Sequence, residues 1–374
     1  MGIGLYIHIP FCKARCSYCD FTSYAGSESL MGPYVKALKT ELEIKTKNKS
    51  ISTVFIGGGT PTALPDELFA DLLGFLQGSL DLADGYEFTV EGNPESMTRE
   101  KISAMKRYGV NRVSMGLQTT DDLLLKNIGR IHDYETFLTA YENLSAAGMR
   151  NVSFDLITGL PGYTMAKLQD TMDKVITLAP NHISIYSLIL EEGTPLSQLV
   201  AKGRVELPDE EADRAMQAYA RDHLAAAGYG KYEISNYSQP GYECKHNISY
   251  WQVQDYIGVG VAAAGFEANR RYQNTPSIET YLELINSGVP AAVESTMNTE
   301  ADNMEEFMFM GLRMINGISM SEFKRRFNQE IAAVYGKVME RYLKTGHMIM
   351  KGDRLCLSEA GLDISNYILS DFIL

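Results

Sequence analysis

The chain has 374 residues, 45% of them hydrophobic and 22% charged, as is typical of a soluble globular protein, and this length predicts two domains or one large barrel with an appendage. Its net charge is −13 and it has no run of Lys and Arg, which argues against a nucleic-acid partner. No stretch approaches ~18 apolar residues and no signal-peptide pattern opens the chain, so we expect a cytoplasmic protein.

In the first half, apolar runs of strand length alternate with amphipathic segments. The predicted strands are Leu5–Ile9, Thr53–Gly57, Tyr86–Glu91, Arg112–Gly116, Asn151–Ile157 and His182–Leu188. The predicted helices are Tyr34–Lys45, Asp66–Gln77, Thr98–Tyr108, Asp121–Lys126, Tyr134–Ala147 and Ala166–Leu178. Strand–helix alternation at this spacing predicts a parallel sheet with crossover helices, and six units predict a partial (β/α)6 barrel.

Unusual residues follow five of these strands where each strand ends. They are Cys12–Cys19, Gly57–Pro61, Glu91–Pro94, Gln118 and Asp155. In barrels of this kind the chemistry lies at the carboxyl ends of the strands. We therefore expect these residues to share one rim.

The second half has a different pattern. Pro208–Gly228 and Ile278–Ser287 are typical of helices, and an aromatic, glycine-rich stretch, Tyr232–Gly265, lies between them. From about Asn303 the pattern predicts helices, a hairpin at His347–Leu357 and a last helix, which resembles a winged-helix module. Its mixed charge favours packing or protein interaction over DNA binding. The predicted domains are 1–230 (barrel), 231–300 (connecting region) and 301–374 (winged-helix-like domain).

Three of the five cysteines form a C-x3-C-x2-C motif at Cys12, Cys16 and Cys19. Closely spaced cysteines hold iron–sulfur clusters, and a cluster usually has four cysteine ligands. Three cysteines would therefore leave one iron of a four-iron cluster open to a substrate or cofactor. A structural zinc site normally has four ligands in paired knuckles, and a disulfide framework needs an even count and a secreted context. The motif therefore predicts a cluster rather than either alternative.

Four further features could carry chemistry, and three of them also have a simple structural explanation. The turn Gly57–Thr62 brings backbone close to a ligand and exposes N–H groups, but glycines also make ordinary tight turns. Glu91 could instead be a solvated carboxylate, and Arg130 could grip a carboxylate or be an ordinary surface arginine. Asp155 lies in an apolar run and, once buried, needs a partner.

Together these motifs resemble the coproporphyrinogen III dehydrogenase/HemW group of radical S-adenosylmethionine (SAM) proteins. The resemblance rests on Tyr6–Phe21, Gly57–Thr62, Glu91–Pro94, Gly129–His132 and Gly159–Gly162 and extends over essentially the whole chain. It implies a [4Fe–4S] cluster on the three cysteines, with SAM bound to the open iron and cleaved reductively to a 5′-deoxyadenosyl radical. The SAM-binding residues that it implies are Tyr6, Tyr18, Gly59, Thr60, Glu91, Gln118, Arg130 and Asp155.

Two branches of this group differ around the cluster motif. The dehydrogenase branch has a longer N-terminal segment and a fourth cysteine two residues after the third. Here that position is Phe21, and eleven residues precede Cys12. Both differences favour the HemW branch, which the resemblance describes as heme chaperones.

A second motif of the HemW branch is H-N-x-x-Y-W, present as His246–Trp251. Imidazole is a common ligand of heme iron and Tyr and Trp offer flat apolar surface, so the resemblance makes His246 the expected heme ligand. An aromatic cluster under a loop is the alternative. Cys244 is a weaker candidate for heme or cluster contact, Cys356 is expected to be a buried thiol in the wing, and Gly258–Gly265 lacks the His that the family often has there.

The resemblance thus implies a heme chaperone that binds heme and passes it to acceptor proteins. The alternative is radical decarboxylation of coproporphyrinogen III. Expected partners are heme and heme-accepting proteins, respiratory ones among the candidates, with peripheral membrane association through the acceptor left open. The sequence does not identify the acceptor, the oligomeric state, the number of SAM molecules or whether SAM is cleaved in the working cycle.

Overall fold

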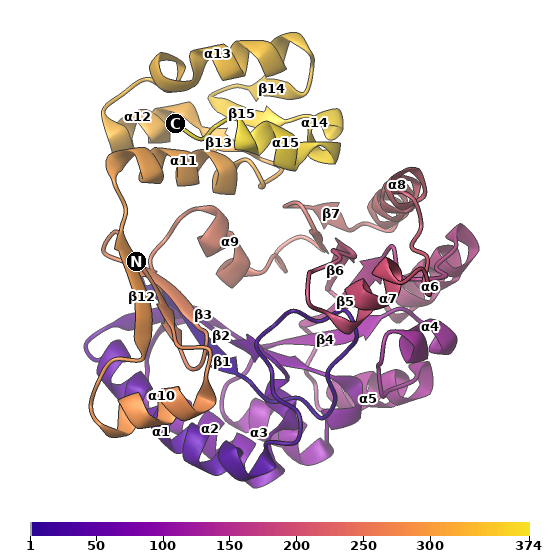
Figure 1. Ribbon diagram of the computed structural model, residues 1–374, viewed down its shortest axis with the longest axis vertical. Coiled ribbons are helices and arrows are strands. Elements are labelled where there is room, and N and C mark those ends of the chain that lie inside the picture. The colour runs from indigo at the N-terminus through magenta and orange to yellow at the C-terminus, as the bar shows by residue number, and fades with distance from the viewer. Residues whose placement is uncertain (1) are drawn as a thin grey trace.

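The computed structural model describes residues 2–374, and a twelve-stranded sheet forms its centre (Figure 1). Its first six strands lie side by side in parallel. They are β1 (Ile3–Ile9), β2 (Ser50–Gly58), β3 (Asp81–Gly92), β4 (Arg112–Gln118), β5 (Val152–Thr158) and β6 (His182–Ser187). All six predicted strands are confirmed, and the parallel α/β architecture with them. Parallel strands are covered on both faces, and every residue of β4 is buried.

Helices connect these strands and cover the outside of the sheet. They are α1 (Glu28–Thr46), α2 (Asp66–Ser79), α3 (Arg99–Arg107), α4 (Asp122–Asn127), α5 (Tyr134–Ala146), α6 (Met165–Leu178), α7 (Pro195–Ala201) and α8 (Glu210–Ala226), with short 3-10 turns η1 (Pro61–Ala63) and η2 (Pro94–Ser96). Figure 1 shows α1, α2 and α3 along one outer face. The apolar stripe of α2, Leu72, Leu73 and Leu76, lies in the main core, as expected for amphipathic helices.

The second half of the chain contains strands that its pattern did not predict. On the side of β1 the sheet continues with β9 (Tyr256–Val259), which is parallel to β1, and then with β10 (Ala264–Glu267), β11 (Arg270–Asn274) and β12 (Ala292–Met297). On the side of β6 it continues with β8 (Asn236–Ser238) and β7 (Gly230–Lys231). A Cβ atom at Gly258 would lie 1.9 Å from the Ala264 carbonyl oxygen, and one at Gly265 2.2 Å from the Tyr272 ring. Close backbone approach thus requires glycines here, and they hid the strand pattern.

One buried carboxylate joins this added sheet to α1. Glu41 is 2% exposed and accepts hydrogen bonds from the Gly260 amide (2.8 Å), the Asn274 side chain (2.8 Å) and the Tyr281 hydroxyl (2.7 Å). Lys45 lies 2.9 Å from the same carboxylate. A buried charge needs such partners, so Glu41 fixes the glycine-rich segment against the parallel strands.

The chain ends in a separate core of helices and a small sheet. Its elements are α11 (Glu300–Gly311), β13 (Ile318–Ser319), α12 (Met320–Phe327), α13 (Ile331–Lys344), β14 (Met348–Lys351), β15 (Arg354–Leu357), α14 (Glu359–Asp363) and α15 (Ser365–Ser370). The hairpin β14–β15 confirms the predicted wing, and Cys356 is buried within it. In Figure 1 this core lies apart from the main sheet, with α9 (Lys245–Trp251) between them.

The two cores have different residue ranges. The main core contains buried side chains from Leu5 to Ala291, and the second contains those from Met304 to Phe372. The expected helix at Ile278–Ser287 is α10 (Ile278–Asn286), which packs on α1. Residues of the predicted connecting region therefore join the main sheet, and the three-domain division stays a prediction. In the described part of the chain, every helix falls short of the length and apolarity needed to cross a membrane.

Candidate functional site

A cavity of about 510 Å³ lies at the carboxyl ends of the parallel strands. The three cysteines and all eight residues expected to contact SAM line it. They are Cys12, Cys16, Cys19, Tyr6, Tyr18, Gly59, Thr60, Glu91, Gln118, Arg130 and Asp155. These residues therefore lie around one cavity, as expected from their places at the strand ends. The ligand that each residue binds stays a prediction.

The three thiols occupy the loop that follows β1. All three are free and half-buried, and burial raises the pKa of Cys12 and of Cys19. Within residues 2–374, no three His, Cys, Asp or Glu side chains are grouped closely enough to hold a single metal ion in this conformation. Iron–sulfur clusters are held by Cys thiolates, and three thiols that line one cavity fit such a cluster.

The glycine turn after β2 supports the cysteine loop through its backbone. The Gly59 amide donates to the Ile9 carbonyl (2.9 Å) and the Thr60 amide to the Phe11 carbonyl (2.8 Å). These N–H groups are therefore not exposed to a ligand, contrary to expectation. Gly58 has φ +107°, and a Cβ there would lie 2.6 Å from the His8 ring. The glycines thus bring the turn against the segment that precedes Cys12.

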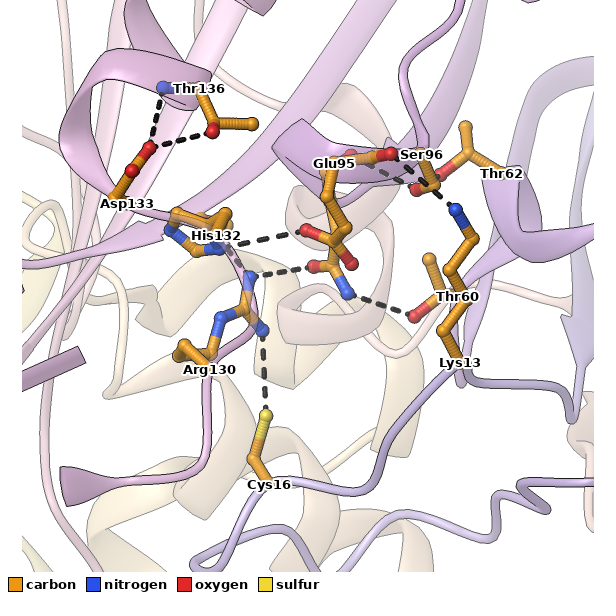
Figure 2. A network of polar contacts seen from close by, with 12 residues as sticks. Lys13, Cys16, Thr60, Thr62, Glu95, Ser96, Arg130, His132, Asp133 and Thr136 are labelled. Atoms are coloured by element: carbon orange, nitrogen blue, oxygen red, sulfur yellow. Dashed lines mark hydrogen bonds and ion pairs between the residues drawn. The ribbon is translucent and has the colours of Figure 1, made fainter. Parts of the chain in front are cut away.

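Arg130 connects the cysteine loop to the end of β3 (Figure 2). One of its terminal nitrogens donates to the Asn93 side chain and to the Gly116 carbonyl, both at 2.8 Å, and the other lies 3.6 Å from Cys16 Sγ. Its guanidinium is thus fixed, with one edge toward a thiol. The interpretation of Arg130 as an ordinary surface arginine is wrong.

A buried pair lies behind Arg130. Figure 2 shows His132 directed toward Glu95, and His132 Nδ1 lies 3.6 Å from Glu95 Oε2. Burial acts to raise the pKa of Glu95, but the His132 side chain and the Arg130 charge hold that pKa below its ordinary value. The pair places a negative charge near Arg130 on the side away from the thiols.

Two acids face the interior of the cavity. Asp155 accepts hydrogen bonds from Ser114 at 3.0 Å and from Ser153 at 3.3 Å, and burial raises its pKa. Burial and the Asp155 charge together raise the pKa of Glu91 to about 8. Glu91 is therefore protonated at neutral pH and is not a solvated carboxylate. A protonated carboxyl can donate a hydrogen bond to a ligand as well as accept one.

Gln118 ends β4 in a conformation that is rare for its residue type. Its φ is +67°, in the left-handed region that costs non-glycine residues about 1 kcal/mol or more. The side chain is 8% exposed and lines the cavity. Such strained conformations cluster at ligand sites, which agrees with the place assigned to Gln118.

Sequence reasoning missed several cavity residues, and Arg112 is the most informative. It is 2% exposed, lines the cavity and has a buried Nε with no hydrogen-bond partner among the described residues. Arg112, Ser114, Gly116 and Gln118 alternate along β4 and all line the cavity. The two-residue period of a strand, continued backward from Gln118, could have identified it. Tyr186 and Asn247 also line the cavity, were missed and have no comparable signal.

His246 does not line this cavity. The imidazole is fully buried, with Nδ1 2.8 Å from the Thr53 hydroxyl and Nε2 2.8 Å from the Tyr250 hydroxyl. It stacks on Phe55, with the ring centroids 5.1 Å apart, and burial lowers its pKa to about 3. In this conformation both nitrogens are occupied, so binding of iron by His246 requires one of these contacts to break.

Cys244 is also buried, at the start of α9. Its thiol donates to Glu87 at 3.5 Å, and burial raises its pKa to about 12. Glu87 also accepts from the Lys245 and His246 amides at 3.0 Å. Cys244 therefore belongs to the packing of the α9 N-terminus, and no contact with the cavity supports the weak expectation of a ligand role.

Comparisons with known proteins identify the family of the chain. Residues 6–175 match the radical SAM superfamily and residues 298–364 match the HemN C-terminal domain. The chain is 35% identical to a protein named heme chaperone HemW from Bacillus subtilis, over 98% of each chain. It is 37% identical to a protein of the same name from Escherichia coli, over 70% of each.

A solved structure has the same fold. The coproporphyrinogen III oxidase HemN of Escherichia coli, described as a radical SAM enzyme, superimposes with a TM-score of 0.87 over 100% of this chain and 90% of its own. The two sequences are 19% identical, so this likeness concerns the fold. It includes both the parallel sheet and the C-terminal core.

Proposed function

The chain belongs to the HemW family of radical SAM proteins, and from this we propose that it binds heme and delivers it to acceptor proteins. The observation that carries the proposal is the similarity to proteins named heme chaperone HemW over 98% of both chains, which includes the second core as well as the cavity. Phe21 in place of a fourth cysteine supports the same choice over coproporphyrinogen decarboxylation.

The cavity residues fit a resident cluster and SAM. We infer that Cys12, Cys16 and Cys19 hold a [4Fe–4S] cluster and that the eight polar and aromatic residues around them hold SAM. With both bound, the site supplies reductive cleavage of SAM. A cluster with thiolate ligands needs a reducing compartment, which supports the expected place in the cytoplasm.

The chain's own side chains have separate tasks in this proposal. Arg130 holds a fixed guanidinium beside Cys16, with a terminal nitrogen 3.6 Å from Cys16 Sγ, and so ties the cysteine loop to the end of β3. Asp155, oriented by two serine hydroxyls, accepts a hydrogen bond from a ligand hydroxyl. Glu91 offers a carboxyl proton at neutral pH. Each group binds or orients a ligand, and none needs to move.

Heme handling is tested with full-length protein, with and without a reconstituted cluster. Titration with heme under anaerobic conditions should give saturable binding near one heme per chain. Heme-loaded protein should then transfer heme to an apo-cytochrome faster than heme-loaded serum albumin does. Failure of the chain to bind heme saturably in either cluster state would refute the proposal.

A second assay separates the chaperone from the decarboxylase. The cluster-loaded protein is incubated with coproporphyrinogen III, SAM and a reductant, and porphyrin product and 5′-deoxyadenosine are both quantified. We expect no catalytic porphyrin product. Multiple turnovers would make the protein the decarboxylase despite Phe21.

A further inference from the structure

A side chain just past β3 lies between two of the groups that contact the cysteine thiols. Asn93 follows the last residue of β3 and directly precedes Pro94, where η2 begins. The residue before a proline is restricted to extended backbone, and Asn93 has φ −99° and ψ 146°. Its carbonyl accepts hydrogen bonds from the Ser96 amide and hydroxyl, both at 3.0 Å. The backbone of Asn93 is therefore fixed at the edge of the cluster cavity, which its side chain lines.

The carboxamide of Asn93 is directed away from the turn that it precedes. An asparagine in this position commonly accepts a hydrogen bond from one of the first amides of the helical turn, and Asn93 makes no such bond. Its oxygen instead accepts from Arg130 at 2.8 Å, and its nitrogen donates to the Thr60 hydroxyl at 3.1 Å. The side chain thus joins the end of β3 to the turn after β2 and to the segment that carries Arg130.

Gly116 on β4 leaves the space for this junction. A Cβ atom there would lie 3.1 Å from a terminal nitrogen of Arg130 and 3.2 Å from the Asn93 side-chain oxygen. The same nitrogen of Arg130 donates to the Gly116 carbonyl at 2.8 Å. A side chain on Gly116 would therefore press on both members of the contact, so glycine at this position allows Asn93 and Arg130 to meet.

The directions of these hydrogen bonds follow from Arg130. A guanidinium can only donate, so the Asn93 oxygen must face Arg130 and the Asn93 nitrogen must face Thr60. That nitrogen can also only donate. The Thr60 hydroxyl oxygen therefore accepts from Asn93, and its own proton is available to a further acceptor. Cys12 Sγ lies 3.4 Å from this hydroxyl oxygen, so Thr60 donates to Cys12.

Arg130 makes the corresponding contact with a second thiol. Its other terminal nitrogen lies 3.6 Å from Cys16 Sγ (Figure 2). A continuous path of contacts therefore runs from one thiol to the other through Thr60, Asn93 and Arg130, with a donor directed at sulfur at each end. The reduction potential of an iron–sulfur cluster depends on charge and on hydrogen bonds to its sulfurs. Donors at sulfur favour the reduced cluster, because it carries one more negative charge than the oxidised cluster.

We propose that Asn93 is a positioning residue that sets the reduction potential of the cluster through the two donors it holds, the Thr60 hydroxyl and the Arg130 guanidinium. The inference rests on the proposed [4Fe–4S] site. An aspartate at this position would accept from both neighbours, because a carboxylate has no donor. The Thr60 hydroxyl would then donate to the carboxylate and not to Cys12, and the added negative charge would offset that of Arg130. Both changes disfavour reduction.

The test is a mediated redox titration of the reconstituted full-length protein without SAM, followed by the electron paramagnetic resonance signal of the reduced cluster. Asn93→Asp keeps nearly the same shape. It should lower the ratio of reduced to oxidised cluster at a given potential about tenfold, as for loss of one charge-assisted hydrogen bond. For a one-electron couple this is a midpoint about 59 mV more negative. Asn127→Asp, at the exposed end of α4, makes the same charge change and should shift the ratio less than about twofold, because solvent screens it.

A second comparison tests whether Asn93 acts through its neighbour. Thr60→Val removes the hydroxyl, so Asn93→Asp should shift the ratio less in the Thr60→Val background than in the wild type. Electron–nuclear double resonance of the reduced wild-type cluster in D2O should also detect an exchangeable deuteron that Thr60→Val lacks. This measurement requires no change at Asn93 and therefore decides even where Asn93→Asp assembles no cluster.

The outcomes separate this inference from the cluster itself. A wild type that assembles no four-iron cluster would overturn both the proposed cluster and the role of Asn93. A wild-type cluster whose midpoint is the same in Asn93→Asp would overturn the role of Asn93 alone, and the cluster assignment would stand. The same conclusion would follow if the wild type and Thr60→Val gave identical deuteron signals.

Discussion

Replacement of Glu91 by Gln tests the electrostatics of the cluster cavity directly. The pKa of Glu91 is raised from 4.5 to about 8 by burial and by the Asp155 charge. The folded protein therefore keeps a proton that the unfolded chain releases above pH 4.5. Because the folded state binds more protons in this window, the stability contribution of Glu91 is present below pH 4.5 and is lost as the pH rises toward 8.

The magnitude follows from the two pKa values. One pKa unit corresponds to about 1.4 kcal/mol, so between pH 5 and pH 7 the wild type should lose up to about 2.5 kcal/mol through this group. Glu91→Gln does not titrate and keeps a similar shape. The difference in the free energy of unfolding, Glu91→Gln minus wild type, should therefore increase by up to about 2.5 kcal/mol from pH 5 to pH 7.

Urea unfolding of the cluster-free protein, followed by circular dichroism at pH 5, 6 and 7, measures this difference. Glu43→Gln, on the exposed face of α1, makes the same change away from the cavity and should show no comparable rise. The infrared band of a protonated carboxyl should also persist to about pH 8 in the wild type and be absent from Glu91→Gln. A stability difference that stays constant from pH 5 to 7 would refute the argument, as would loss of that band by pH 6.

Three further changes follow from the structure. Cys16→Ala should abolish the visible absorbance of the cluster and the iron content of the reconstituted protein. Cys356→Ala, at a buried cysteine of the wing, should retain both. Burial lowers the pKa of His246 from 6.5 to about 3, so the wild type should lose stability as the pH falls from 6.5 toward 3. At neutral pH the melting temperature of His246→Phe should be lower than that of the wild type. A difference between the two melting temperatures that does not narrow in acid would contradict this. Glu41→Ala leaves buried donors and Lys45 without their acceptor, and should cost about 3 kcal/mol in the free energy of unfolding, while Glu43→Ala should cost much less in the same urea titration.

Local patterns in the sequence determined the first half of the fold and the members of the main site. The two-residue and 3.6-residue periods of apolar side chains report which face of a segment is buried, so the six parallel strands and their helices could be predicted. The carboxyl ends of parallel strands meet at one edge, which is why Cys12, Glu91, Gln118 and Asp155 could be assigned to one rim. The spacing of the cysteines required no tertiary information.

Only the tertiary structure decided which groups these residues meet. The pairing of β9 with β1 joins segments about 250 residues apart, and the glycines that allow it interrupt the strand pattern. The amides of Gly59 and Thr60 are bonded to the cysteine loop, and His246 is enclosed by Thr53 and Tyr250. A motif states which side chains are available, but whether a nitrogen is free for iron depends on partners brought from distant strands, and these are fixed only when the chain has folded.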